Sequence, residues 1–321
     1  MNDRQQDVGF STIRAEVLKQ CFASRSFSIA GALQAGGHEN PLGLPRSKPI
    51  PQNLSARMQR NVPQKRPIPN VKKIIAVSSA KGGVGKSTLA VNLALASARQ
   101  GISTGILDAD IYGPSIPTLL NLEGLEPELD ERNFLVPLTA YGLKAISIGF
   151  LIPVTSPLAW RAPLLQKALS QLLFETSWPP LDLLVLDLPP GTGDIQLTIA
   201  QSLELAGAVI VSTPQDLALR DAVRGVGFWE RTGVKRLGMV QNMSGFVCGG
   251  CGEVTDIFGG DGAKRKCEEL GLDFLGDIPL HASICADADA GKPTVVANPD
   301  GPQAKAFGDI MSKISKQIGL A

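Results

Sequence analysis

One nine-residue segment restricts the possible folds of this chain more than any other. Residues 80–88 read Ala-Lys-Gly-Gly-Val-Gly-Lys-Ser-Thr, and they follow the short β-branched run Lys73–Ser78. The apolar spacing of the next residues, Ser87–Gln100, predicts a helix that stops before Gly101. A glycine-rich turn between a strand and a helix is the context of the G-x-x-x-x-G-K-[ST] phosphate loop. The match is relaxed at its first position, where Ala80 replaces the usual glycine.

The residue types of this segment suit the phosphates of a nucleotide. Its glycines let the backbone curl so that N–H groups point at phosphate oxygens, and the following helix adds the partial positive charge of its N-terminus. Lys86 supplies a charge for the β- and γ-phosphates, and the Ser87 hydroxyl is suited to Mg²⁺. The predicted nucleotide-binding residues of the loop are Gly82, Gly83, Val84, Gly85, Lys86, Ser87 and Thr88.

Carboxylates at two predicted strand ends complete such a site. The apolar run Leu183–Leu186 ends in Asp187, which is placed to hold Mg²⁺ through a water. The Pro- and Gly-rich residues 188–194 follow it, and they are predicted to form a loop that senses the γ-phosphate. Asp108 and Asp110 stand at the tip of another predicted strand, where one of them can orient an attacking water. The alternative for Asp108 and Asp110 is an ordinary solvated acidic turn.

Short apolar runs alternate with helical patterns through the rest of the chain. The further strand-like runs are Thr104–Asp108, Leu181–Leu186, Ala208–Val211 and Arg236–Val240. The helical patterns are Leu164–Glu175, Leu217–Glu230, Ala263–Leu270 and Ala304–Ile318. Because parallel strands need crossover helices, this alternation predicts an α/β P-loop fold with a mostly parallel sheet covered by helices on both faces. Residues 130–148 are predicted to form a β-hairpin insertion.

Charge divides the chain into a basic head and an acidic body. Up to Lys73 there are 12 basic and 4 acidic residues, and the remainder holds 19 basic and 26 acidic ones, so the total of +1 conceals +8 and −7. The stretch Phe10–Ala35 is basic, Ser-rich and poor in acids, which is typical of a mitochondrial presequence; a disordered basic tail is the alternative. We predict a presequence at 1–36, a Pro-rich linker at 37–70 and one P-loop domain at 71–321.

Composition excludes several classes of protein. With 44% hydrophobic and 19% charged residues, the chain is neither collagen-like nor wholly disordered. No apolar run approaches the ~18 residues of a membrane-spanning helix, so no transmembrane segment is predicted. Five cysteines are too few, and odd in number, for a disulfide framework, which indicates a reducing compartment. The acidic body argues against nucleic acid as a partner.

The additional lysine of the loop, Lys81, makes the segment resemble the deviant phosphate loop of MinD, ParA and the nitrogenase iron protein. The chain also resembles the Mrp family of iron–sulfur carrier ATPases in four further segments, which are 108–117, 187–194, 241–244 and 246–252. These motifs occur in the family's order from about Val71 to the C-terminus. The head and residues 39–45 resemble the mitochondrial branch of the family, which is needed to assemble respiratory complex I.

The resemblance implies a nucleotide-sandwich homodimer and a role for each matched residue. Lys81 would reach across the dimer to the partner's phosphates. Asp187 would be the carboxylate linked to magnesium, and Asp110 the switch residue nearest the attacking water, with Asp108 beside it. Asn242 would read the adenine ring, or else cap a strand end. The expected catalytic residues are Lys81, Lys86, Asp110 and Asp187. Hydrolysis should be slow, because no internal arginine finger is evident.

The pair Cys248 and Cys251 is the feature that selects a function. Two thiols at a C-x-x-C spacing in a Gly-rich loop can both turn toward one metal. A 4Fe–4S cluster usually needs four thiolates, and a twofold axis would supply two from each of two chains. The family usually has a proline after the first cysteine, where this chain has Gly249, so the loop should be more flexible. A structural zinc ion bridging the dimer and a redox dithiol remain alternatives.

We therefore expect a homodimeric, slow ATPase of the mitochondrial matrix that binds ATP and Mg²⁺ and carries a 4Fe–4S cluster to apoproteins, with complex I subunits among them. The other cysteines in the body, Cys267 and Cys285, are interpreted as packing or incidental, and His281 as structural. The alternative is a partition or positioning ATPase of the ParA or MinD kind. That function would want a basic patch or a C-terminal amphipathic anchor, and residues 303–321 contain only three basic side chains, all lysines.

Overall fold

The computed structural model describes residues 65–151, 162–248 and 250–320. The predicted presequence and most of the predicted linker lie outside these residues. The last residues of the linker lie within them and pack on the domain, because Arg66 forms a β-bridge with Leu203 and the Ile68 side chain is buried. The folded part therefore begins before Val71.

The described residues form a nine-stranded sheet that is mostly parallel. Its order is β3-β4-β2-β5-β1-β6-β7-β8, and β9 pairs with β7. The strands are β1 (Val71–Ser78), β2 (Thr104–Asp108), β3 (Leu138–Ala140), β4 (Leu143–Ser147), β5 (Leu181–Asp187), β6 (Gly207–Ser212), β7 (Arg236–Val247), β8 (Val254–Thr255) and β9 (Phe274–Leu280). Only the β3–β4 and β7–β8 pairings are antiparallel.

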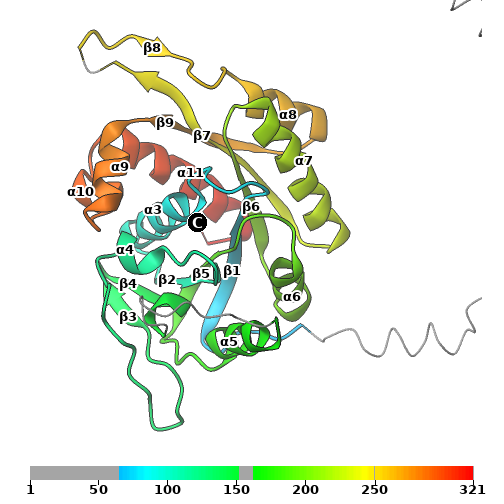
Figure 1. Ribbon diagram of the computed structural model, residues 1–321, viewed down its shortest axis with the longest axis vertical. Coiled ribbons are helices and arrows are strands. Elements are labelled where there is room, and N and C mark those ends of the chain that lie inside the picture. Colours follow the sequence, from blue (N-terminus) through cyan, green and yellow to red (C-terminus); the bar gives the residue numbers. More distant parts are fainter. Residues whose placement is uncertain (1–64, 152–161, 249, 321) are drawn as a thin grey trace, which may run out of the picture. The chain divides into compact units, whose positions relative to one another are not determined.

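Helices cover both faces of this sheet (Figure 1). They are α3 (Lys86–Arg99), α4 (Ile116–Leu119), α5 (Ala162–Phe174), α6 (Asp194–Ser202), α7 (Asp216–Arg231), α8 (Gly262–Leu270), α9 (Ala282–Asp289), α10 (Thr294–Ala297) and α11 (Pro302–Ile318), with a 3₁₀ turn η2 at Ile148–Phe150. From β1 the chain moves through α3 to β2 in one direction along the sheet, and from β5 onward it moves in the other. Since crossovers are right-handed, α3 lies on one face and α5 to α8 lie on the opposite face.

The predicted α/β class and the two covered faces are confirmed by this arrangement. The central strands β2 and β6 are buried at every residue, as expected of parallel strands between two helix layers. Among the described residues, every helix is too short or too polar to cross a membrane.

Two sequence predictions need correction. Residues 138–147 do form a hairpin, but its second strand, β4, pairs in parallel with β2, so this region is part of the main sheet and not an insertion. The strand predicted at Arg236–Val240 continues to Val247 and leaves the sheet with β8 as a two-stranded ribbon, which extends beyond the helices in Figure 1. In this ribbon, backbone hydrogen bonds between β7 and β8 support the part of β7 that lies beyond the end of the predicted strand.

Candidate functional site

The phosphate loop connects the carboxyl end of β1 to the start of α3. Gly83 and Gly85 both have a φ of 79°, a left-handed conformation that glycine adopts without a steric penalty. Gly85 is the N-cap of α3, and no side chain caps this helix, so its first N–H groups are free for an anion. A Cβ atom on Gly85 would lie 2.2 Å from Nδ2 of Asn242, so any other residue here would have to displace the Asn242 side chain.

Four residues predicted for catalysis or metal binding meet at this loop. Lys86 Nζ lies 2.5 Å from Asp187 Oδ1, 3.1 Å from Ser87 Oγ and 3.8 Å from Asp110 Oδ2. The Lys86 side chain is 7% exposed and that of Asp187 is fully buried, so this contact is screened little by water. These side chains come from α3, from the end of β5 and from the loop after β2.

The carboxylates at this position outnumber the single ammonium group. Burial raises the pKa of Asp187 and of Asp110, and Lys86 opposes the rise in both. Burial, together with the negative charge of Asp187, raises the pKa of Asp108 to about 7. The Oδ2 atom of Asp187 is buried without a hydrogen-bond partner among the described residues. A site with this excess of buried carboxylate oxygens suits a cation.

Asp108 has a different environment from the other two carboxylates. Its Oδ1 accepts a hydrogen bond from Asp110 N at 3.0 Å, and its Oδ2 accepts from Ile116 N at 3.3 Å and from Ser147 Oγ at 2.9 Å. Both oxygens therefore hold the loop between β2 and α4, in which Asp110 lies. Sequence reasoning missed Ser147, because nothing in its local pattern distinguishes it from any serine at a strand end.

The loop after β5 is fixed to the phosphate-loop strand by backbone contacts. Leu188 N donates to Val77 O at 3.1 Å, and Gly191 N donates to Ser79 O at 2.8 Å. The buried side chain of Gln196, on α6, donates to Pro189 O at 2.6 Å. The loop predicted to sense the γ-phosphate is thus connected to β1 on one side and to α6 on the other.

A cavity of about 410 Å³ opens beside the phosphate loop. Thr88, Asn242 and Met243 line it, and Asn242 Nδ2 donates to Val84 O at 2.8 Å. Residues that the sequence did not assign to the nucleotide site complete the wall, among them Pro114, Ser115, Pro279, Leu280, His281, Ile284 and Cys285. The wall residues from Pro279 to Cys285 could have been predicted from the strand end at Leu280, because the carboxyl ends of parallel strands meet at the edge of the sheet that binds ligands.

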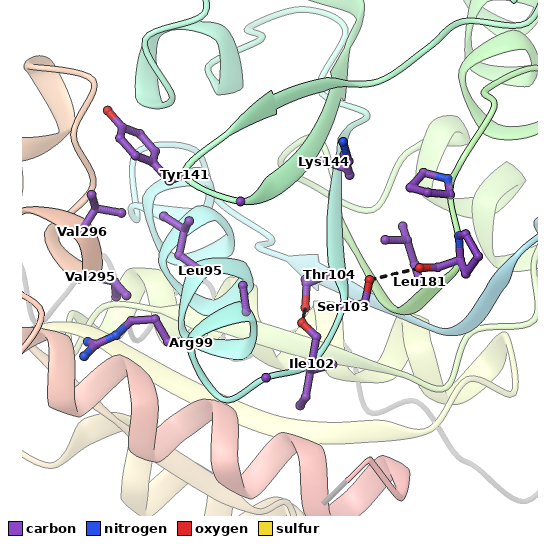
Figure 2. A pocket seen from close by; sticks show the side chains of 15 residues that line it. Leu95, Arg99, Ile102, Ser103, Thr104, Tyr141, Lys144, Leu181, Val295 and Val296 are labelled. Atoms are coloured by element: carbon purple, nitrogen blue, oxygen red, sulfur yellow. Dashed lines mark hydrogen bonds between the residues drawn. The ribbon is translucent and has the colours of Figure 1, made fainter.

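A second cavity, of about 540 Å³, lies at the opposite edge of the sheet, where β2 and β5 begin (Figure 2). Tyr141, Arg99 and Val295 line one side of it, and Ser103 and Leu181 line the other. None of the predicted nucleotide or metal residues lies here. The smaller cavity is therefore the candidate site, because it joins the uncapped helix end to the cluster of carboxylates.

Lys81 and the cysteine pair lie apart from these contacts. Lys81 is half-buried and forms no ion pair with another described residue. Cys248 follows the end of β7, and the turn is closed by Cys248 N donating to Glu253 O and Gly252 N donating to Cys248 O, both at 2.9 Å. The N–H groups of Cys251 and Gly250, and the Cys251 thiol, donate to the Cys248 sulfur and lower its pKa.

The remaining thiols of the described residues have different surroundings. Cys267 is buried in α8, and burial raises its pKa to about 11. Cys285 is exposed and, with His281, lines the cavity beside the phosphate loop, although sequence reasoning had assigned neither a role there. His281 Nδ1 accepts from Ser283 N and so caps α9, as a structural residue would. Within the part of the chain that the structure describes, no third Cys, His, Asp or Glu joins the cysteine pair in one metal-binding group.

Comparisons with known proteins agree with this geometry. An archaeal nucleotide-binding protein from Archaeoglobus fulgidus, solved in complex with ADP, is 37% identical and superimposes with a TM-score of 0.64 over 74% of this chain and 92% of its own. MinD from Pyrococcus furiosus, at 19% identity and a TM-score of 0.57 over 76% of this chain and 98% of its own, shows the same fold.

Sequence relatives are closer. The "Iron-sulfur cluster transfer protein NUBPL" of Dictyostelium discoideum is 52% identical over 79% of both chains, and that of Mus musculus is 47% identical over 85% of this chain and 86% of its own. The "Iron-sulfur cluster carrier protein" of Escherichia coli is 49% identical over 78% of this chain and 68% of its own. A family model described as the NUBPL iron-transfer P-loop NTPase, of the ParA type, matches residues 70–315. The chain therefore belongs to the NUBPL family of iron-transfer P-loop NTPases.

Proposed function

We propose that this chain is a homodimeric, ATP-dependent carrier that assembles a 4Fe–4S cluster and hands it to apoproteins, with complex I subunits of the mitochondrial matrix as clients. The observation that carries the proposal is the pair of adjacent thiols, Cys248 and Cys251, in the turn that follows the strand holding Asn242 against the phosphate loop. Relatives named as iron–sulfur cluster transfer and carrier proteins support this cargo.

The nucleotide binds between the phosphate loop and the cavity beside it. The free N–H groups at the start of α3 bind the phosphates, and Lys86 adds its charge once it turns from Asp187 toward them. The adenine ring enters the cavity lined by Asn242, whose amide lies next to the loop.

The residues at the loop also fit a magnesium ion. The buried Oδ2 of Asp187 lacks a hydrogen-bond partner among the described residues, and the carboxylates of Asp110 and Asp187 share the single ammonium group of Lys86. Ser87 and Asp187 would hold the ion, which when bound would supply positive charge to the phosphate oxygens. Asp110 orients the attacking water. Lys86 and the partner subunit's Lys81 offset the charge that develops on the γ-phosphate.

Slow hydrolysis follows from what is missing around the phosphates. No arginine of the described residues lines the cavity beside the loop, so these residues supply no arginine there to stabilise the transition state. Slow hydrolysis suits a carrier, because the bound ATP then keeps the protein in one conformation for as long as the cluster is bound.

A second copy of the chain completes the cluster site. One ribbon offers two thiols, whereas a 4Fe–4S cluster takes four. The ribbon also exposes apolar side chains next to its cysteines: Phe246 is 37% exposed and Val254 is 63% exposed. An isologous contact between two ribbons buries these side chains and brings four sulfurs to one axis.

Anaerobic reconstitution with iron and sulfide tests the cargo. We expect about four iron and four sulfide ions per two chains and a visible charge-transfer absorbance, both lost in Cys248→Ser/Cys251→Ser. The matched control is Cys267→Ser/Cys285→Ser, which removes two thiols outside the ribbon and should keep the cluster. Equal iron and absorbance in the two double variants would contradict the proposal, as would zinc without sulfide in protein purified anaerobically.

A further inference from the structure

A single strand carries residues of both candidate sites. Asn242 and Met243, near the middle of β7, line the cavity of about 410 Å³ beside the phosphate loop. Cys248 follows the last residue of the same strand. Four residues of continuous backbone, 244–247, therefore separate the nucleotide cavity from the cysteine pair.

Met243 has an unusual backbone conformation for a strand residue. Its φ is 57°, in the left-handed region that side chains with a Cβ atom rarely adopt. Pairing with β9 is interrupted at this point, since Asn242 lies opposite Ile278 and Phe246 lies opposite Leu280, so that four steps on β7 face two on β9. Met243 thus stands at the start of an irregular bend between the sheet and the ribbon.

This bend is held on both sides. On the nucleotide side, Asn242 Nδ2 donates to Val84 O at 2.8 Å and lies within 2.2 Å of where a Cβ atom on Gly85 would stand. On the ribbon side, Ser244 Oγ lies 2.9 Å from Asp277 Oδ2 and 3.2 Å from Ile278 O. A strained residue between two anchored neighbours keeps its conformation only while both anchors hold.

We propose that Met243 is a positioning residue that transmits nucleotide binding to the cysteine pair. A nucleotide in the cavity contacts Asn242 and Met243 and selects between the left-handed conformation and an extended one. Because side chains alternate along a strand, that change turns the residues after Met243 and reorients Cys248 and Cys251. The inference rests on the proposed function for the cargo and concerns the regulation of its release.

Thiol labelling of the full chain without a cluster tests this link separately from the cargo. In a Cys21→Ser/Cys285→Ser background, the labelling rate of Cys248 and Cys251 is measured with and without Mg²⁺ and a non-hydrolysable ATP analogue. We expect the analogue to change the rate by about fivefold or more, as typical couplings between sites do. Met243→Gly, compared with the parent at a saturating concentration of the analogue, should abolish this change, because glycine adopts both conformations freely. Met243→Leu should retain it.

Control variants separate the link from general loosening of the chain. Asn133 has a φ of 62° in a loop away from the cavity, so Asn133→Gly should leave the nucleotide effect unchanged. Ser244→Ala removes the hydroxyl contacts that anchor the ribbon side of the bend. This variant should therefore also reduce the change in labelling rate, without altering Met243 itself. An unchanged effect in Met243→Gly or Ser244→Ala, or no effect in the parent, overturns the inference, whereas failure to assemble a cluster overturns only the proposed cargo.

Discussion

At the scale of single residues, the effect of one added methyl group in the phosphate loop on stability and ATP binding can be tested. Gly85→Ala would place a Cβ atom 2.2 Å from Asn242 Nδ2 at a φ of 79°. We expect this variant to lose roughly 1–3 kcal/mol of unfolding free energy and to bind ATP poorly. Gly82→Ala is the matched control, because its Cβ atom would meet nothing within 4 Å. Denaturant unfolding without nucleotide decides the matter; equal stability of the two variants would contradict the close approach.

The thiols of the body should differ in reactivity for physical reasons. Burial raises the pKa of Cys267 to about 11, and its side chain is 2% exposed, so iodoacetamide should leave it unmodified in the folded protein. Hydrogen bonds lower the pKa of Cys248, so its thiolate persists to lower pH than an ordinary thiolate does. Peptide mass spectrometry at pH 7 should find Cys248 alkylated and Cys267 intact, with the Cys248 rate falling as pH falls. Modification of Cys267 before unfolding would refute its assigned burial.

At the scale of elements, the turn before β3 depends on one charged carboxylate. Asp130 accepts hydrogen bonds from Phe134 N at 2.9 Å and Arg132 N at 2.8 Å, and from the Arg132 side chain. The Phe134 contact is the largest cause that lowers the Asp130 pKa. The folded pKa lies below the unfolded one, so this stabilisation is present above the unfolded pKa and is lost as pH falls through the folded pKa.

Asp130→Asn should therefore lower the melting temperature at pH 7 and lose this deficit as the pH is reduced toward the folded pKa. Thermal unfolding followed by circular dichroism over the acid range provides the measurement. Asp300→Asn removes a carboxylate that is 95% exposed and serves as the control for net charge. A deficit that stays constant with pH would show that the Asp130 charge does not stabilise the turn.

The helices and strands that were predicted correctly are those whose own residue pattern favours the observed secondary structure. β2 and β6 are short apolar runs, and α7 has a clear polar and apolar face. α6 was missed because Ile195, Thr198 and Ile199 are β-branched residues of low helix propensity. Of β9, only residues 277–280 are recognisable in the sequence as part of a strand and loop, because Gly276 and Pro279 interrupt its pattern. In each missed case, packing against the rest of the sheet overrides the local preference.

The candidate site likewise contains residues that could be predicted from the sequence and residues that could not. Lys86 and Ser87 are adjacent in sequence, and Asp187 ends a recognisable strand, so the phosphate loop and its carboxylate were predictable. The cavity wall was not, because Pro114 and Leu280 come together only through the order of the strands. The left-handed backbone conformation of Met243 could not be predicted either, since no residue pattern indicates a strained methionine within a strand.

At the scale of the whole molecule, the sheet order explains why these functions share one edge. The strand β1 lies between β5 and β6, where the direction of the crossovers reverses, and the phosphate loop leaves its carboxyl end. β7 ends at the same edge and continues outward as the ribbon with the cysteines. The proposed cluster site thus lies on a ribbon that projects from the edge of the sheet where the phosphate loop lies, and in the proposed dimer a second copy at this edge contacts both proposed sites at once.

Lys81 provides the test of that assembly. In the proposed dimer it contacts the partner's phosphates, and it has no ion pair with another described residue of its own chain. Lys81→Ala should keep nucleotide binding in the monomer but weaken nucleotide-dependent dimerisation about tenfold or more, since truncating one member of a buried charge pair costs at least ~2 kcal/mol. Lys305→Ala, at an exposed position on α11, is the control. Sedimentation with Mg²⁺ and a non-hydrolysable ATP analogue measures the effect. If Lys81→Ala and Lys305→Ala dimerise equally well, the lysine does not act across the dimer, and the ribbons must bring the two chains together on their own.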